Sequence, residues 1–193
     1  MRTILFCAGL VLTGCTTTQG SSANTHSGAA DRSGTASSPV ALAQHPFTAK
    51  EIRGATGEGR EYRFRIDTPE GSTLRRSRFS DVTDAGATIE TGAIDDAGNP
   101  LGTPRVSSTT WAALRAHADF PREATTIEDV TVDVPAGHFD AWLYTVRKSE
   151  DGVEVVSRFW FAKALPGAPV QAEITRGGTR VMRMTLVQHR PGK

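Results

Sequence analysis

Apolar and polar residues alternate in several short runs between residues 46 and 193, and this alternation constrains the fold more than any other feature of the chain. In the clearest run, Tyr62, Phe64 and Ile66 are separated by charged residues. A period of two is typical of a β-strand with one buried face and one solvated face. The same pattern predicts further strands at residues 130–134, 142–144, 153–161 and 182–187.

Three more polar runs predict weaker strands, at residues 74–84, 87–94 and 101–108. Polar strands suit the edges of a sheet, whereas the apolar runs at 142–144 and 153–161 are expected at its centre. Short segments rich in Gly, Pro, Asn and Asp separate the runs. Strands joined by such short turns pair as antiparallel neighbours, because a parallel crossover needs about a dozen residues or more. The chain is therefore expected to form an antiparallel meander.

One helix is expected to interrupt the meander at residues 110–120. Thr110 can cap its N-terminus, Trp111 begins its apolar face, and Pro121 ends it. A shorter helical turn is expected at residues 47–53. The predicted fold is mainly β, a long antiparallel meander curled into a half-open barrel with helix 110–120 as its plug. A two-sheet sandwich is the alternative, but it would need apolar inner faces on all strands.

The first fourteen residues have the organisation of an export signal. Arg2 precedes an uninterrupted apolar stretch at residues 4–12, which is about half as long as a transmembrane helix needs to be. The sequence Leu-Thr-Gly-Cys follows at residues 12–15. This motif resembles the lipobox of bacterial lipoproteins.

The lipobox resemblance implies that the chain is cleaved before Cys15, whose thiol receives a diacylglycerol and whose amino group is then acylated. Such a chain is held on the bilayer by its acyl chains. Thr16 stands where an Asp would retain the product at the inner membrane, which favours the outer membrane, facing the periplasm. Ordinary signal cleavage with Cys15 incidental is the alternative, but a free cysteine beside the cleavage site of an exported chain would be unusual.

Residues 16–45 are mostly Ser, Ala, Thr and Gly and contain no aromatic residue. This composition predicts a flexible tether, in which His26 and His45 are expected to be inert. The expected organisation is a signal peptide at 1–14, lipidated Cys15 and tether at 15–45, and a single β-rich domain at 46–193.

Composition excludes several functions. The chain has 22 Lys and Arg against 21 Asp and Glu, a balance that does not favour nucleic acid as a partner. Both cysteines lie within the first fifteen residues, so the domain has neither a thiol nucleophile nor a cysteine-based metal site. GxSxG, HExxH, P-loop and GxGxxG motifs are all missing from the sequence. We expect no cofactor and no metal.

Three motifs in the second half of the chain resemble a series found in uncharacterised exported bacterial domains. They are an AGxF hairpin at residues 136–139, a strand ending in WF at 160–161, and a PGxxV turn at 166–170. More distantly, the expected topology is similar to the half-barrels of the outer-membrane lipoprotein carrier and receptor proteins LolA and LolB. This resemblance implies an architecture, and it transfers no functional residue.

Six apolar residues are candidates for lining a ligand cleft. They are Trp111, Trp142, Phe159, Phe161, Met182 and Met184. The alternative is that they fill the core, as methionine and aromatic residues on a strand face usually do.

Polar candidates are fewer. Arg75, Arg76 and Arg78 form the densest basic cluster and are candidates for contact with anionic lipid headgroups, although a charged edge strand explains them as well. His138 and Asp140 share a strand face and would suit a general base, but a solvated hairpin is favoured because no nucleophile stands beside them.

Two further features have a functional and a plain interpretation. His117 lies on the expected helix and is the other histidine candidate for chemistry. The Pro-Gly segment at residues 165–169 is either a partner-binding loop or a type II turn, and the turn is favoured.

The sequence as a whole favours a non-enzymatic binding module that is anchored to the membrane by lipid and takes an apolar ligand or a protein partner. A structural or accessory subunit of an envelope assembly, without a ligand cavity, is the alternative. A periplasmic hydrolase is the third and least favoured function, because no catalytic motif is found.

Overall fold

The computed structural model describes residues 40–193. The expected signal peptide, the lipidation site at Cys15 and most of the expected tether lie outside the described residues. Within the described part, no helix has both the length and the apolar character needed to cross a membrane.

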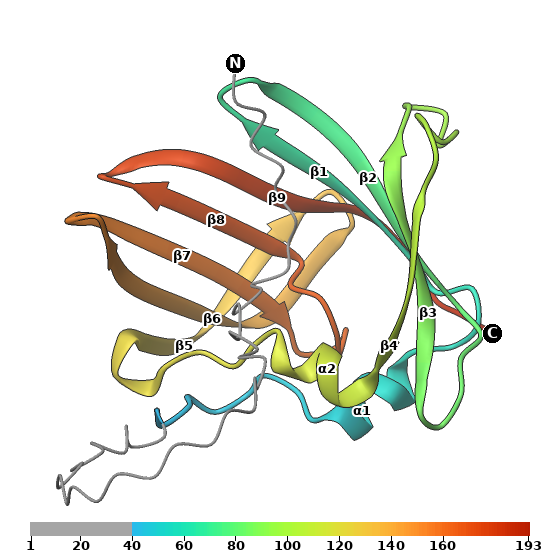
Figure 1. The fold of residues 1–193 in the computed structure, drawn as a ribbon, viewed down its shortest axis with the longest axis horizontal. Helices are drawn as coiled ribbons and strands as arrows, with labels where there is room; N and C mark the ends of the chain where they lie inside the picture. The colour runs from blue at the N-terminus through green and yellow to red at the C-terminus, as the bar shows by residue number, and fades with distance from the viewer. Residues whose placement is uncertain (1–39) are drawn as a thin grey trace, which may run out of the picture. The chain divides into compact units, whose positions relative to one another are not determined.

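Nine strands form a single antiparallel sheet (Figure 1). The first four are β1 (Glu61–Thr68), β2 (Gly71–Ser80), β3 (Gly86–Ile94) and β4 (Arg105–Thr110). The other five are β5 (Thr125–Val134), β6 (Gly137–Glu150), β7 (Val153–Ala162), β8 (Gln171–Arg176) and β9 (Thr179–Arg190).

The strand order is β4-β3-β2-β1-β9-β8-β7-β6-β5, so two meanders meet where the first strand pairs with the last. Consecutive strands are antiparallel neighbours within each meander, as their short turns predict. β4 and β5 form the two edges and do not pair with each other, so the sheet is not closed into a barrel. Figure 1 shows the sheet strongly curved, with β2–β4 on one side and β6–β8 on the other.

The prediction that the two apolar runs lie at the centre of the sheet is met only in part. The runs at 142–144 and 153–161 lie in β6 and β7, which have a neighbour on each side but lie toward the β5 edge. The polar run at 87–94 is expected at an edge and is instead the interior strand β3. The central pair is β1 and β9, because the two ends of the domain pair with each other. Of the three polar runs, the one at 101–108 overlaps an edge strand, β4.

Two short α-helices lie beside the sheet near one end (Figure 1). In α1 (Ala49–Ala55), Thr48 and Glu51 form a capping box that satisfies backbone N–H groups of the first turn. In α2 (Trp111–Ala116), the Thr110 hydroxyl accepts from the Ala113 N–H at 3.1 Å, which confirms Thr110 as the cap.

Helix α2 is shorter than the expected 110–120. The N–H groups of residues 117, 118 and 119 bond to carbonyls three residues back, so the chain continues in tighter turns after Ala116. Pro121 is followed by a 3₁₀ turn, η1 (Arg122–Ala124).

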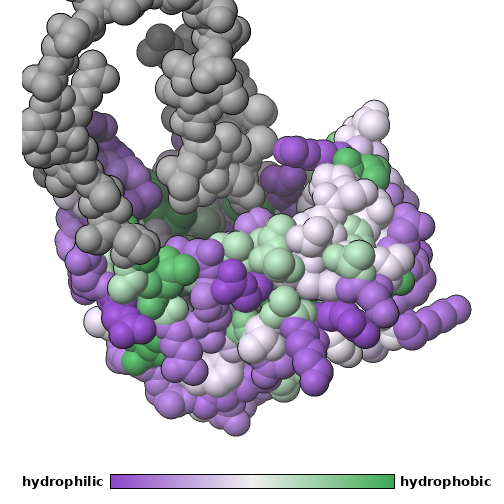
Figure 2. All heavy atoms as spheres, turned by 60° about the horizontal axis from the view of Figure 1, so that its bottom comes forward, coloured by the Kyte–Doolittle hydropathy of each residue, from purple (hydrophilic) through white to green (hydrophobic). Residues whose placement is uncertain are grey.

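The main core lies between the helices and the sheet. Phe47 and Ile52 from the α1 region pack with Trp111 of α2 against strand residues that include Tyr62 and Leu186. Trp111 is 5% exposed, and its indole N–H donates to the Thr83 carbonyl at 3.0 Å. Figure 2 shows the helix end from outside, where hydrophobic areas are interspersed with hydrophilic ones.

Residues 40–45 belong to the folded part, although their composition alone assigns them to the tether. Ala43 is 6% exposed, and its N–H donates to the Phe120 carbonyl at 2.8 Å. The hydroxyl of Tyr144 donates to the Gln44 carbonyl at 2.8 Å. His45 contacts Asp119 at 2.5 Å, so it is a fixed part of the fold and not an inert tether residue.

Candidate functional site

The inner face of the sheet, which α1 and α2 cover, carries apolar side chains in rows that run across the strands. The first row follows the pairing of Phe64 with Leu186 and of Phe161 with Trp142. Phe64, Leu186 and Phe161 are 6%, 0% and 5% exposed. This row is therefore part of the packed core.

The second row lies two residues along each strand from the first row. It runs from Ile66 through Met184, Ala172 and Phe159 to Tyr144. Ala172 and Tyr144 are buried, whereas the other three are half-buried. The row is thus covered at some positions and accessible at others.

The third row runs from Met182 through Ile174 and Ser157 to Val146, and all four residues are half-buried. Exposure of the inner face therefore rises from the first row to the third.

Aromatic contacts cover the first two rows. The ring of Phe47 contacts Trp142 at 5.7 Å and Phe161 at 6.3 Å between centroids. The ring of Phe120 stacks on Phe159 at 5.1 Å and contacts Tyr144 at 5.9 Å. In the described part, these contacts end at the second row.

Five of the six apolar candidates lie together on the inner face: Trp142, Phe159, Phe161, Met182 and Met184. Trp111 comes from α2. Phe161 and Trp111 fill the core, whereas Phe159, Met182 and Met184 are half-buried. The rings of Phe47 and Phe120 contact Phe161 and Phe159 of β7.

The expected basic cluster is divided between the two faces of the sheet. Arg75 pairs in register with Phe64 and lies on the inner face, whereas Arg76 and Arg78 lie on the outer face. Arg76 is engaged in an ion pair with Glu90. The strand alternation therefore separates the three arginines, and they do not form one headgroup site.

The histidine candidates do not assemble a catalytic pair. The imidazole Nδ1 of His138 lies 2.7 Å from a carboxylate oxygen of Asp133, its partner in the hairpin register, and the His138 side chain is 62% exposed. Asp140 is not in contact with it. His117 is exposed at the end of α2. In the part of the chain that is described, no three His, Cys, Asp or Glu residues group as metal ligands.

The loop at residues 165–169 is packed into the domain. The carbonyl of Pro166 accepts from Nη1 of Arg60 at 2.9 Å. Gly167 has a φ of 138°, and a Cβ there would lie 3.0 Å from the Tyr62 hydroxyl. A glycine is needed at this close approach, so the loop is a structural turn and not a freely presented binding loop.

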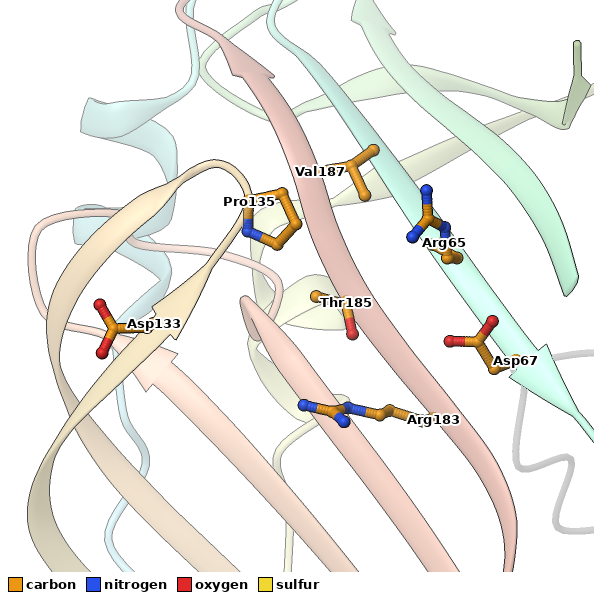
Figure 3. Close-up of a pocket in the computed structure, with 7 residues that line it drawn as sticks. All are labelled: Arg65, Asp67, Asp133, Pro135, Arg183, Thr185 and Val187. Atoms are coloured by element: carbon orange, nitrogen blue, oxygen red, sulfur yellow. The ribbon is translucent and has the colours of Figure 1, made fainter. Parts of the chain in front are cut away.

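A second candidate site lies on the outer face of β1 and β9 (Figure 3). We call it the charged pocket. It has a volume of about 250 Å³ and is lined by Arg65, Asp67, Asp133, Pro135, Arg183, Thr185 and Val187. A shallow hollow of about 320 Å³ also occurs around Asp129 and Lys163, where an ion pair between these two residues neutralises both charges.

Sequence analysis missed the charged pocket. Arg65 and Asp67 are visible as the polar face of a strand, as is Arg183. Their proximity depends on the pairing of β1 with β9, which are more than a hundred residues apart in the chain.

Solved structures with some similarity to this fold are found at low sequence identity. The chain is structurally similar to a protein described as a lipoprotein from Parabacteroides distasonis ATCC 8503, with a TM-score of 0.46 and 10% identity, over 76% of this chain and 98% of that one. It is also similar to an outer membrane lipoprotein-sorting protein domain from Vibrio parahaemolyticus, with a TM-score of 0.28 and 10% identity, over 76% of this chain and 92% of that one.

The resemblance expected from the sequence is thus found as a structural similarity. It assigns no ligand, partner or residue role. No family model matches the sequence, and no curated protein matches it either.

Proposed function

We propose that this chain is a lipid-anchored, extracytoplasmic binding module that takes an apolar chain, such as an acyl chain, on the inner face of its sheet. The single observation that supports this proposal best is the gradient of exposure across the inner face. Apolar side chains continue past the packed first row and become half-buried in the second and third rows. Apolar surface that the protein itself does not fully cover is typical of ligand and partner sites.

The dimensions and chemistry of these rows suit an extended apolar ligand. From Ile66 on β1 to Phe159 on β7 the second row crosses three strand spacings, or about 14 Å. Met182 and Met184 add flexible, polarizable side chains that adapt to a ligand. In this proposal the sheet acts as a half-open barrel, and α1 and α2 act as the plug at one end.

A fluorescent fatty acid added to the full-length protein in detergent tests this proposal. We expect saturable binding that is lost in Met184→Trp, because the larger side chain would cover Ala172, which lies between Met184 and Phe159 in the second row. The matched control is Val106→Trp on the edge strand β4, where Val106 is 62% exposed and away from the inner rows. Absence of saturable binding, or equal binding by both variants, would reject the apolar site.

The proposed location of the protein in the cell depends on the N-terminal motif. Export, lipidation of Cys15 and location at the outer membrane, facing the periplasm, are supported by the apolar stretch, the Leu-Thr-Gly-Cys sequence and Thr16. A lipid anchor would keep the inner face near a source of acyl chains.

A second function, an accessory subunit of an envelope assembly, is favoured by the β4 edge. Val106 of β4 is 62% exposed, Leu101 in the preceding loop is 61% exposed, and β4 has no strand partner on its outer side in the described part of the chain. An unpaired edge with exposed apolar residues can add a strand from a partner protein. The variant Ser107→Pro in β4 is expected to weaken the binding of a partner strand at this edge and to leave fatty-acid binding intact. This difference separates the two functions.

A further inference from the structure

The charged pocket is built where three segments meet on the outer face of the sheet. β1 and β9 pair Arg65 with Thr185 and Asp67 with Arg183. The N–H of Ala136 donates to the Leu186 carbonyl at 3.3 Å, which holds the tip of the β5–β6 hairpin against β9. Figure 3 shows the result, with the hairpin residues Asp133 and Pro135 forming the wall opposite β1.

Asp67 and Arg183 stand opposite each other but do not form an ion pair with each other. Asp67 accepts from the Ser72 hydroxyl at 2.5 Å, and Nη2 of Arg183 donates to the side-chain carbonyl of Gln171 at 3.1 Å. Cross-strand neighbours of opposite charge usually interact. Here each charge retains capacity for another partner.

The described protein atoms engage the guanidinium of Arg183 only in part. The Nε–H of Arg183 is buried and has no hydrogen-bond partner among them. Arg65 has no ion pair in the described part of the chain. The Arg183 Nε has almost no accessible surface, so a ligand in the pocket reaches Arg183 through its Nη atoms.

We propose that the charged pocket binds a small zwitterion of the α-amino acid class. The carboxylate of such a ligand accepts from the Nη atoms of Arg183 and from Arg65, and its ammonium group donates to Asp67, the cross-strand neighbour of Arg183. Pro135 and Val187 offer the apolar contact for a small side chain. Volume agrees with this size class, since about 250 Å³ lies below the range of drug-sized ligands.

The balance of charges selects a zwitterion over a simple ion. Two arginines would attract a bare anion, but the two aspartates repel it. In the same way, the aspartates would attract a bare cation, but the arginines repel it. A molecule that carries both charges a few ångströms apart can meet Asp67 and Arg183 together. This site lies on the face opposite the apolar rows, so it is independent of the proposed acyl-chain function.

Calorimetric titration of the full-length protein in detergent with L-alanine, acetate and methylammonium tests the proposal. We expect saturable binding of L-alanine and binding of either simple ion that is weaker by about tenfold or more. Acetate binding as tight as that of L-alanine would overturn the zwitterion assignment, and absence of saturable L-alanine binding would overturn the site.

Variants then assign the roles of the residues. Arg183→Gln is expected to weaken L-alanine binding by about tenfold or more, and Asp67→Asn to weaken L-alanine without weakening acetate. The matched control is Arg147→Gln, which removes an exposed arginine that pairs with Glu154 and does not line the pocket. Equal L-alanine affinity in Arg183→Gln and Arg147→Gln would reject the proposal. Thermal melting checks folding, and Arg65→Gln replaces Arg183→Gln if that variant does not fold.

Discussion

Nε of Arg60 donates to Nε2 of His189 at 3.2 Å, and this contact ties the start of β1 to the end of β9. Arg60 is 2% exposed, and its Nη1 also donates to the Thr56 hydroxyl at 3.2 Å and to the Pro166 carbonyl at 2.9 Å. Its guanidinium carbon lies 4.8 Å from the centre of the Tyr62 ring. A buried cation is thus held by neutral acceptors and an aromatic face.

The Arg60–His189 contact predicts a pH dependence of stability. His189 must be neutral to accept from Arg60, and burial, together with the charge of Arg60, lowers the pKa of His189. In the unfolded chain a histidine binds its proton below about pH 6.5. As the pH falls below that value, the unfolded state binds more protons than the folded state, so the free energy of unfolding decreases.

Urea denaturation at about pH 7.5 and pH 5.5 measures this loss. The variant His189→Gln keeps a hydrogen-bonding group without a titrating one, and it is expected to lose less stability between the two pH values. If wild type and variant lose equal stability over this interval, His189 is not the titrating group.

The Tyr62 hydroxyl predicts a stabilising substitution. It is buried without a hydrogen-bond partner among the described atoms, and burial raises the pKa of Tyr62 to about 12 despite the opposing charge of Arg60. Removing an unsatisfied hydroxyl avoids its desolvation cost. Tyr62→Phe is therefore expected to raise the free energy of unfolding by about 1 kcal/mol, measured by urea denaturation. A loss of about 1 kcal/mol or more would mean that the hydroxyl has a partner in solution.

The alternation of apolar and polar residues predicted where the strands lie in the sequence better than it predicted their order in the sheet. The alternation of Tyr62, Phe64 and Ile66 predicts which side of β1 is buried, and the structure agrees for Tyr62 and Phe64. It cannot predict that β9 is the neighbour of β1, because this pairing depends on how two meanders meet. The error about the central strands has the same cause.

Sequence analysis did not predict β8, because the alternation of apolar and polar residues in this strand is weak. Its buried residues are Gln171 and Ala172, which are polar and small, and the next four are half-buried. The strand is held by neighbours on both sides and by the turn at Gly177 and Gly178, both of which have positive φ. The charged pocket was missed for a related reason, since its residues meet only through the β1–β9 pairing and the hairpin tip.

Trp111 is expected to contribute strongly to the core. The side chain is 5% exposed, and its indole N–H satisfies the Thr83 carbonyl. Trp111→Ala is expected to lower the free energy of unfolding by about 3 to 5 kcal/mol, because it leaves a large cavity. Trp111→Phe retains most of the ring and should cost less. Urea denaturation of both variants measures these effects, and an unchanged midpoint in Trp111→Ala would contradict the packing.

Cys15 is predicted to carry the lipid anchor, and Cys15→Ser tests it. Only a thiol accepts the diacylglycerol, so the serine variant should remain uncleaved or leave the membrane, and it should not incorporate a fatty-acid analogue. Cys7→Ser is the matched control, since Cys7 lies within the apolar stretch of the proposed signal peptide; the mature protein should be labelled as in wild type. Membrane fractionation and labelling of the three chains measure the outcome. Equal labelling of Cys15→Ser and wild type would mean that the anchor is attached elsewhere or is missing, and the proximity of the inner face to membrane acyl chains would lose its basis.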